Sequence, residues 1–153
     1  MEKIVIASDH AGFDFKEKMI LFLRKKGLEV KDLGTYSAER CDYPEYAYAL
    51  AKEIAQKKYK RGILVCKSGI GNSIVANRLP GVRAALCYNV KAAQLSREHN
   101  DSNVLVMGSA FVSLPLAKKM AAAWLAAEFQ GGRHQKRLDL IKKIEKQIGA
   151  RQR

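Results

Sequence analysis

The chain has 153 residues, 48% of them apolar, which is enough for one domain with a sizeable core. Its 28 lysines and arginines outnumber its 15 acidic residues and give a net charge of +13, which favours nucleic acid or small anionic substrates. No apolar run reaches the roughly 18 residues of a membrane span, and the first residues lack the layout of a signal peptide. Cys41, Cys66 and Cys87 show neither a Cys-x-x-Cys spacing nor a disulfide framework, so we expect a reducing, cytoplasmic setting.

Strand and helix patterns alternate along the whole chain. The apolar periodicity predicts strands over residues 3–8, 28–33, 63–65, 82–87 and 103–107. It predicts helices over residues 13–26, 44–58, 72–78, 89–98, 113–129 and 133–148. Repeated strand–helix units with right-handed crossovers build a parallel sheet. We therefore predict an α/β fold, a single doubly wound, Rossmann-like domain over residues 1–150. Its five-stranded parallel sheet is flanked by helices, a basic helix ends the domain, and the basic end at 151–153 is frayed.

Residues 62–78 combine a buried strand, a turn with two glycines and the start of a helix, with Asn72 as the expected N-cap. Such a turn offers free backbone N–H groups and the positive end of a helix dipole, which together favour an anion. Cys66 ends the strand, and a thiol near a helix N-terminus can have a lowered pKa and act as a base or nucleophile. The alternative is that Cys66 is an ordinary core cysteine. Neither a dinucleotide fingerprint nor a phosphate loop fits, because Ile74 replaces the third glycine and no Gly-Lys-Ser/Thr follows.

Polar residues in other predicted turns could act together with Cys66. Asp9 and His10 follow the first strand, and ligands of doubly wound sheets bind beyond the carboxyl ends of the strands. His99 and Asn100 fall in the turn that enters the fifth strand, which starts at the opposite edge of the sheet. They reach the same site only if this segment folds back or a second subunit brings it in.

The start of the last predicted helix carries a basic group. Arg133 and Arg137 are one helical turn apart, with His134 beside them, so both guanidinium groups share a face. Paired arginines suit a phosphate through bidentate, charge-assisted hydrogen bonds. The alternative is an ordinary solvated basic helix.

Six sequence blocks occur in a fixed order over essentially the whole chain. They are Ala7-Ser-Asp-His-Ala-Gly12, Asp42-Tyr43-Pro44, Cys66-x-Ser-Gly-Ile-Gly71, Asn77-Arg78 with Pro80-Gly-Val-Arg83-Ala-Ala, Ser96-Arg-Glu-His-Asn100, and Phe129-Gln-Gly-Gly-Arg-His134 with Arg137. As a set they resemble the type B ribose-5-phosphate isomerases, within the wider family that includes galactose-6-phosphate and allose-6-phosphate isomerases. The resemblance implies an aldose–ketose isomerase that interconverts ribose 5-phosphate and ribulose 5-phosphate through an enediolate, with no metal and no organic cofactor. It also implies a homodimer with active sites shared at the subunit interface, with dimers possibly paired into tetramers.

The resemblance also implies a role for each matching residue. Cys66 would be the base that moves a proton between C1 and C2, while Ser68 and the N–H groups of Gly69 to Gly71 would hold the enediolate oxygens. His99, with Asp9 nearby, would open the sugar ring by general acid–base transfer. The remaining residues would bind substrate, with the phosphate held by His10, Arg133, Arg137 and, less directly, His134, and the sugar lined by Tyr43 and Asn100.

The sequence departs from the pattern of these isomerases in two places, the central turn and Ala110. The central turn usually reads Cys-Gly-Thr-Gly, whereas here Lys67 and Ser68 occupy the middle positions, and a lysine disfavours positive φ. Ala110 stands where many relatives carry an arginine, so one phosphate contact would be missing. These departures leave open an isomerase of allose 6-phosphate or galactose 6-phosphate, or a non-catalytic sugar-phosphate sensor. A nucleic-acid-binding protein is disfavoured, because the basic residues are not interleaved with aromatics and no recognition motif is present.

Overall fold

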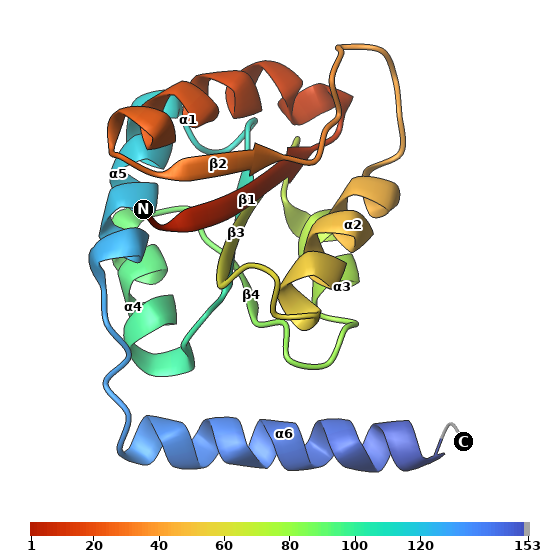
Figure 1. Cartoon of the computed structure of the whole chain (residues 1–153), viewed down its shortest axis with the longest axis vertical. Helices are drawn as coiled ribbons and strands as arrows, with labels where there is room; N and C mark the ends of the chain where they lie inside the picture. The colour runs from red at the N-terminus through yellow and green to blue at the C-terminus, as the bar shows by residue number, and fades with distance from the viewer. Residues whose placement is uncertain (152–153) are drawn as a thin grey trace.

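A computed structural model describes residues 1–151, and within them five strands form one parallel sheet (Figure 1). The strands are β1 (Lys3–Ser8), β2 (Glu29–Asp32), β3 (Arg61–Cys66), β4 (Ala84–Leu86) and β5 (Val104–Gly108). Their order in the sheet is β2-β1-β3-β5-β4, and each neighbouring pair is parallel. The predicted doubly wound α/β fold is therefore confirmed.

Helices cover both faces of this sheet. Within the same residues they are η1 (His10–Gly12), α1 (Phe13–Lys25), α2 (Tyr43–Ala55), α3 (Ile70–Ala76), α4 (Val90–Asn100), α5 (Leu114–Ala126) and α6 (Arg133–Arg151). Buried residues of α1, α4 and α5 pack on one face, and those of α2 and α3 pack on the other (Figure 1). Because side chains alternate along a strand, Ile6 and Ile63 enter the first core while Ala7 and Leu64 enter the second.

The start of α3 differs from the sequence prediction. The helix begins at Ile70, and its N-cap is Gly69 in a left-handed conformation with φ of 83°. Asn72 lies inside the first turn and is buried, so its prediction as the N-cap is wrong. The left-handed conformation is available to glycine without the steric penalty of a Cβ, and this fixes the helix start two residues early. Smaller differences shorten β4 to three residues and end α5 at Ala126.

α6 lies outside the α/β body and runs along one side of it, starting beneath α4 (Figure 1). Its contacts with the body include His134, which is buried, and Glu145, whose Oε1 accepts a hydrogen bond from the Gly81 N–H group at 3.2 Å. Four of its apolar side chains are 45–53% exposed: Leu140, Ile141, Ile144 and Ile148. The helix includes Arg151, and the rest of the end predicted to fray, residues 152 and 153, lies outside the described residues.

Two further features bear on where a site can form. No helix within residues 1–151 combines the length and apolar character needed to cross a membrane.

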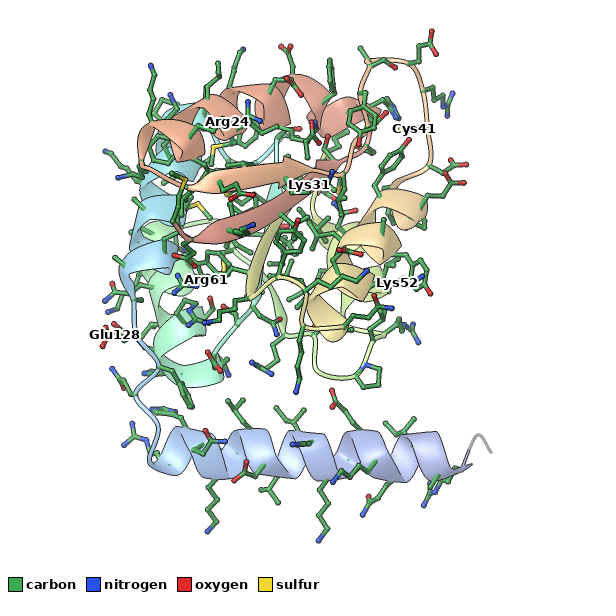
Figure 2. The ribbon with its side chains drawn as sticks, in the orientation of Figure 1. Arg24, Lys31, Cys41, Lys52, Arg61 and Glu128 are labelled. Atoms are coloured by element: carbon green, nitrogen blue, oxygen red, sulfur yellow. The ribbon has the colours of Figure 1, made fainter. Side chains whose placement is uncertain are left out.

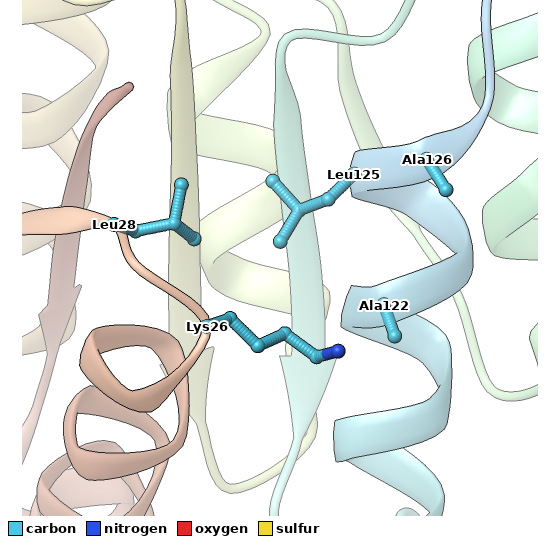
Figure 3. A pocket seen from close by; sticks show the side chains of 5 residues that line it. All are labelled: Lys26, Leu28, Ala122, Leu125 and Ala126. Carbon is cyan, nitrogen blue, oxygen red and sulfur yellow. The ribbon is translucent and has the colours of Figure 1, made fainter. Parts of the chain in front are cut away.

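A shallow pocket of about 250 Å³ lies between the end of α1 and the end of α5, lined by Lys26, Leu28, Ala122, Leu125 and Ala126 (Figure 3). Because Leu28 directly precedes β2, this pocket lies at the amino-terminal edge of the sheet, and none of the predicted site residues lines it.

Candidate active site

The carboxyl ends of β1 and β3 lie side by side where the strand order reverses, because β2 lies on one side of β1 and β5 on the far side of β3. Ser8 of β1 pairs with Val65 of β3, so Asp9 and Cys66 follow directly at the same edge. In open α/β sheets this switch point is where ligands bind. The fold therefore brings together the first two groups of polar residues that the sequence placed in turns.

Cys66 is 4% exposed, and its Sγ accepts a hydrogen bond from the Gly69 N–H group at 3.0 Å. Burial raises the pKa of the Cys66 thiol, and the nearby Asp9 carboxylate raises it further. The backbone N–H groups of Gly69, Asn72 and Ser68 lower this pKa, but the net shift is upward. The expectation that the helix N-terminus lowers the pKa of the thiol is therefore wrong for the unliganded chain, since desolvation outweighs the backbone groups.

The turn after Cys66 is fixed by the neighbouring strand β5. The Ser109 N–H group donates to the Cys66 carbonyl at 2.8 Å, and the Ala110 N–H group donates to the Lys67 carbonyl at 2.9 Å. A Cβ atom at Gly108 would overlap the Ser68 carbonyl, so the close approach requires glycine there. Lys67 is exposed and is not among the residues with positive φ, so the turn accommodates it.

Asp9, His10 and Tyr43 complete this group of residues. Asp9 is buried, and its Oδ1 accepts a hydrogen bond from the Gly12 N–H group at 3.0 Å. The Nδ1 atom of His10 lies 3.0 Å from the carbonyl oxygen of Cys41 and 3.2 Å from its backbone nitrogen. This contact orients the His10 ring and leaves its Nε2 atom for a ligand.

Tyr43 begins α2, and its ring packs against Gly71, where any larger side chain would overlap it. Ser68 is half-buried, and its Oγ accepts a hydrogen bond from the Ile70 N–H group at 3.2 Å. Cys41, on the loop that leads into α2, is labelled in Figure 2. Gly69 and Gly71 thus have structural reasons to be glycine besides any role toward a ligand.

His99, Asn100, Arg133, His134 and Arg137 form a second group. His99 and Asn100 are the last two residues of α4, so the prediction that they lie in a turn is wrong. The helix continues until Asp101, which adopts a left-handed conformation with φ of 44° and ends it. The rings of His99 and His134 are stacked, with centroids 4.2 Å apart and planes at 9°. Burial lowers the pKa of His134, and the neighbouring His99, Arg133 and Arg137 lower it further.

The two groups lie at opposite edges of the sheet within one chain. α4 ends just before β5 begins, and the Gly62 N–H group at the start of β3 donates to the Asn103 carbonyl at 2.9 Å. Cys66 is at the far end of β3, five residue rises from Arg61, or about 17 Å. Figure 2 marks this second edge with Arg61 and with Glu128, which precedes α6. One chain therefore does not bring His99 within proton-transfer distance of a sugar held at Cys66.

Two residues near the site were not singled out as ligand contacts from the sequence. Asn72 is 1% exposed, and its backbone N–H group is one of those that lower the pKa of Cys66. The hydroxyl of Tyr88 donates to the Ser68 carbonyl at 3.3 Å, and the ring of Tyr88 packs edge-on against Phe111. The signal available for Asn72 was its position one helical turn before Ala76, on the face that packs on the sheet.

Comparison with known proteins identifies the family of this chain. Residues 4–141 match the Ribose/Galactose Isomerase family. The chain is 48% identical over 145 residues to the ribose-5-phosphate isomerase B of Escherichia coli (strain K12), covering 95% of this chain and 97% of that protein.

Solved structures give the same result. A ribose-5-phosphate isomerase B from Clostridium thermocellum superposes with a TM-score of 0.94 at 46% identity, covering 95% of this chain and 99% of that one. The enzyme from Mycoplasma genitalium, with bound ribulose-5-phosphate, gives a TM-score of 0.90 at 40% identity, covering 94% and 96%. The chain therefore belongs to the Ribose/Galactose Isomerase family.

Proposed function

We propose that this protein interconverts ribose 5-phosphate and ribulose 5-phosphate through an enediolate. The observation that carries the proposal is the position of Cys66 beside Asp9 and the first N–H groups of α3, at the switch point of the sheet. A proton acceptor next to donors for a developing oxyanion is the arrangement that this reaction needs. The name of the E. coli relative and the ligand in the M. genitalium structure support this substrate.

Cys66 acts in this proposal as the base. Its thiolate takes the proton from C2 of the open-chain aldose, the electron pair forms the C1–C2 double bond, and the negative charge moves to the oxygen on C1. The hydroxyl proton of the oxygen on C2 moves to the oxygen on C1, and return of the carbon-bound proton to C1 then leaves a carbonyl at C2, which is the ketose. The Gly69 N–H group already donates to Sγ and favours the thiolate, so Ser68 and the Gly71 N–H group are the donors proposed for the enediolate.

Ring opening and phosphate binding are assigned to the remaining residues. His99, together with Asp9, opens the furanose ring by moving a proton between the ring oxygen and the anomeric hydroxyl. His10, Arg133 and Arg137 bind the phosphate, His134 supports the His99 ring by stacking on it, and Tyr43 and Asn100 line the sugar.

These assignments require a homodimer in which each site takes residues from both chains. His99 and the α6 arginines lie at the amino-terminal edge of their own sheet, whereas a two-fold axis can place them over the partner's strand ends. Exposed apolar residues are present on both elements that would meet, with Ile70 and Ile74 on α3 and Leu140, Ile141, Ile144 and Ile148 on α6. Burial of such a face between two copies removes it from water.

An isomerase of galactose 6-phosphate or allose 6-phosphate is the second candidate, because Ala110 lies after β5 at the same edge as Cys66 and offers no cationic side chain there. The test is ketose formation from ribose 5-phosphate, allose 6-phosphate and galactose 6-phosphate at equal concentrations. We expect the highest kcat/KM for ribose 5-phosphate. A higher value for either six-carbon sugar would assign the protein to that substrate, and no turnover of any of the three would contradict the proposed function.

A further inference from the structure

The side-chain NH2 group of Asn72 is buried without a hydrogen-bond partner among the residues that the structure describes. Asn72 is 1% exposed, and its Nδ2 atom finds no acceptor among residues 1–151. Buried amide donors are nearly always paired, because an unpaired one loses its bonds to water and gains none in return. An orphaned donor in a folded protein therefore calls for an explanation, and one such explanation is a ligand that supplies the acceptor.

The amide lies on the side of the sheet that carries the chemistry. Asn72 and Ala76 are four residues apart on α3 and share its inner face, and Ala76 packs in the same core as Ala7 and Leu64. Alternation along β1 and β3 puts Asp9 and Cys66 on this same side, directly beyond Ala7 and Leu64. The backbone N–H group of Asn72 already acts on the Cys66 thiol. The orphaned donor thus belongs to the immediate surroundings of Cys66.

Two other donors of the turn are engaged, which leaves the Asn72 amide to act beside the Ser68 hydroxyl and the Gly71 N–H group proposed above. The Gly69 N–H group donates to Cys66 Sγ at 3.0 Å, and the Ile70 N–H group donates to Ser68 Oγ at 3.2 Å. A developing negative charge on the sugar needs donors that are free and already in place, since these need no rearrangement during the reaction. The Asn72 amide meets both conditions, and it adds no charge that would disturb the thiol.

We propose that Asn72 is a substrate-contacting residue, whose Nδ2–H group donates a hydrogen bond to the oxygen on C1 or C2 of the open-chain sugar phosphate. This inference rests on the proposed isomerase function and assigns to that site a residue that the sequence pattern had assigned to capping the helix. The bond strengthens as charge develops on the oxygen, so Asn72 acts mainly on the enediolate and less on the bound aldose.

The test replaces the amide by an apolar group of nearly the same shape, Asn72→Leu, with Asn72→Ala as a smaller variant that cannot clash. Ser8→Ala is the matched control, because Ser8 Oγ is also buried with no partner among residues 1–151 but lies on the side of the sheet that faces Ile4 and Ile6. We expect kcat/KM to fall by about 10²-fold in both Asn72 variants, the scale for one lost donor to an oxyanion. The Ser8→Ala protein should keep wild-type activity.

Two binding measurements separate a substrate contact from a packing role. A phosphorylated four-carbon hydroxamate carries two adjacent oxygens like the enediolate, and calorimetry should show its affinity falling with kcat/KM in the Asn72 variants. Inorganic phosphate, which reports only on the phosphate-binding residues, should bind all variants equally. The melting temperature of Asn72→Leu should equal or exceed that of the wild type, because no hydrogen bond within the chain is lost.

Wild-type kcat/KM and hydroxamate affinity in Asn72→Leu would overturn the inference. So would a lower melting temperature with equally weakened phosphate binding, because Asn72 would then be a packing residue. If the wild-type protein turns over none of the sugar phosphates, the proposed function fails by itself. Hydroxamate binding to the wild type and the Asn72 variants then still decides whether the amide contacts a ligand.

Discussion

At the scale of single residues, the Cys66 thiol is subject to opposing influences. Burial and the Asp9 carboxylate disfavour the thiolate, whereas the Gly69, Asn72 and Ser68 N–H groups favour it, and the balance raises the pKa. Below that raised pKa the free protein holds Cys66 mainly as the neutral thiol. If the thiolate is the base, turnover should therefore rise with pH up to this pKa, because the reactive form becomes more populated.

The role of Cys66 can be tested by removing its sulfur. The Cys66→Ala protein should fold and lose about 10²-fold or more in kcat, the usual scale for a positioned base. Cys87→Ala is the matched control, since Cys87 is also buried at the end of a strand and burial raises its pKa to about 11, yet it has no assigned role. Near-normal turnover by folded Cys66→Ala would contradict the assignment.

The influence of Asp9 on the thiol gives a second prediction at this scale. Asp9→Asn removes a negative charge that raises the pKa of Cys66, so the thiolate should form at lower pH. The measurement is the rate of iodoacetamide alkylation at Cys66 against pH, read by mass spectrometry of the peptide that contains it. The midpoint should move to lower pH in Asp9→Asn. A midpoint that stays or moves upward would show that Asp9 does not act on the thiol electrostatically.

At the scale of elements, a buried ion pair ties α1 to the end of β2. Lys16 is fully buried, and its Nζ atom lies 2.6 Å from Asp32 Oδ2 and 2.9 Å from Glu17 Oε1. The other oxygen of Asp32, Oδ1, accepts a hydrogen bond from the Gly34 N–H group at 2.8 Å. Asp32 thereby fixes the start of the loop whose far end supplies the Cys41 backbone contact to His10.

Breaking this ion pair should destabilise the protein. Lys16→Met leaves Asp32 partly buried without its cation, and we expect the free energy of unfolding to fall by about 1–3 kcal/mol. Lys18→Met is the control on the same helix, because Lys18 is exposed and lies 3.6 Å from exposed Asp14, a kind of pair that contributes less than about 1 kcal/mol. Urea denaturation measures both variants. Equal stability of the two would show that the Lys16 ion pair contributes no more than a surface pair.

The elements also show what sequence patterns can and cannot predict. Within residues 1–151 apolar periodicity located the five strands and the six α-helices, because burial on one or two faces imposes the pattern directly, whereas the short η1 was predicted as a turn. It misplaced the start of α3, which depends on the left-handed conformation of Gly69, and the end of α4, which depends on that of Asp101. Tertiary contacts decide the backbone conformation at both of these helix ends. The buried amide of Asn72 was missed because an asparagine at a helix start is most simply explained as a cap.

At the scale of the whole molecule, the residues assigned to one reaction lie at two edges of the same sheet. Asp9 and His10 follow β1 and Cys66 ends β3, while His99, near the end of α4, and Arg137, on α6, lie at the opposite edge. The proposed homodimer resolves this separation, because a two-fold contact is reciprocal and builds two complete sites from two pairs of half-sites. A monomer could bind parts of the substrate but could not complete both ring opening and proton transfer.

Mixing two inactive variants tests this arrangement directly. Arg137→Ala should weaken binding of the phosphorylated sugar, and Cys66→Ala should abolish proton transfer, so each homodimer has two defective sites. After subunit exchange between equal amounts, about half of the dimers are mixed, and each mixed dimer carries one site with both defects and one with neither. About a quarter of wild-type activity should therefore return. If both residues served the same chain's site, no intact site could form, so an absence of recovery after exchange verified by mass spectrometry would rule out the shared site.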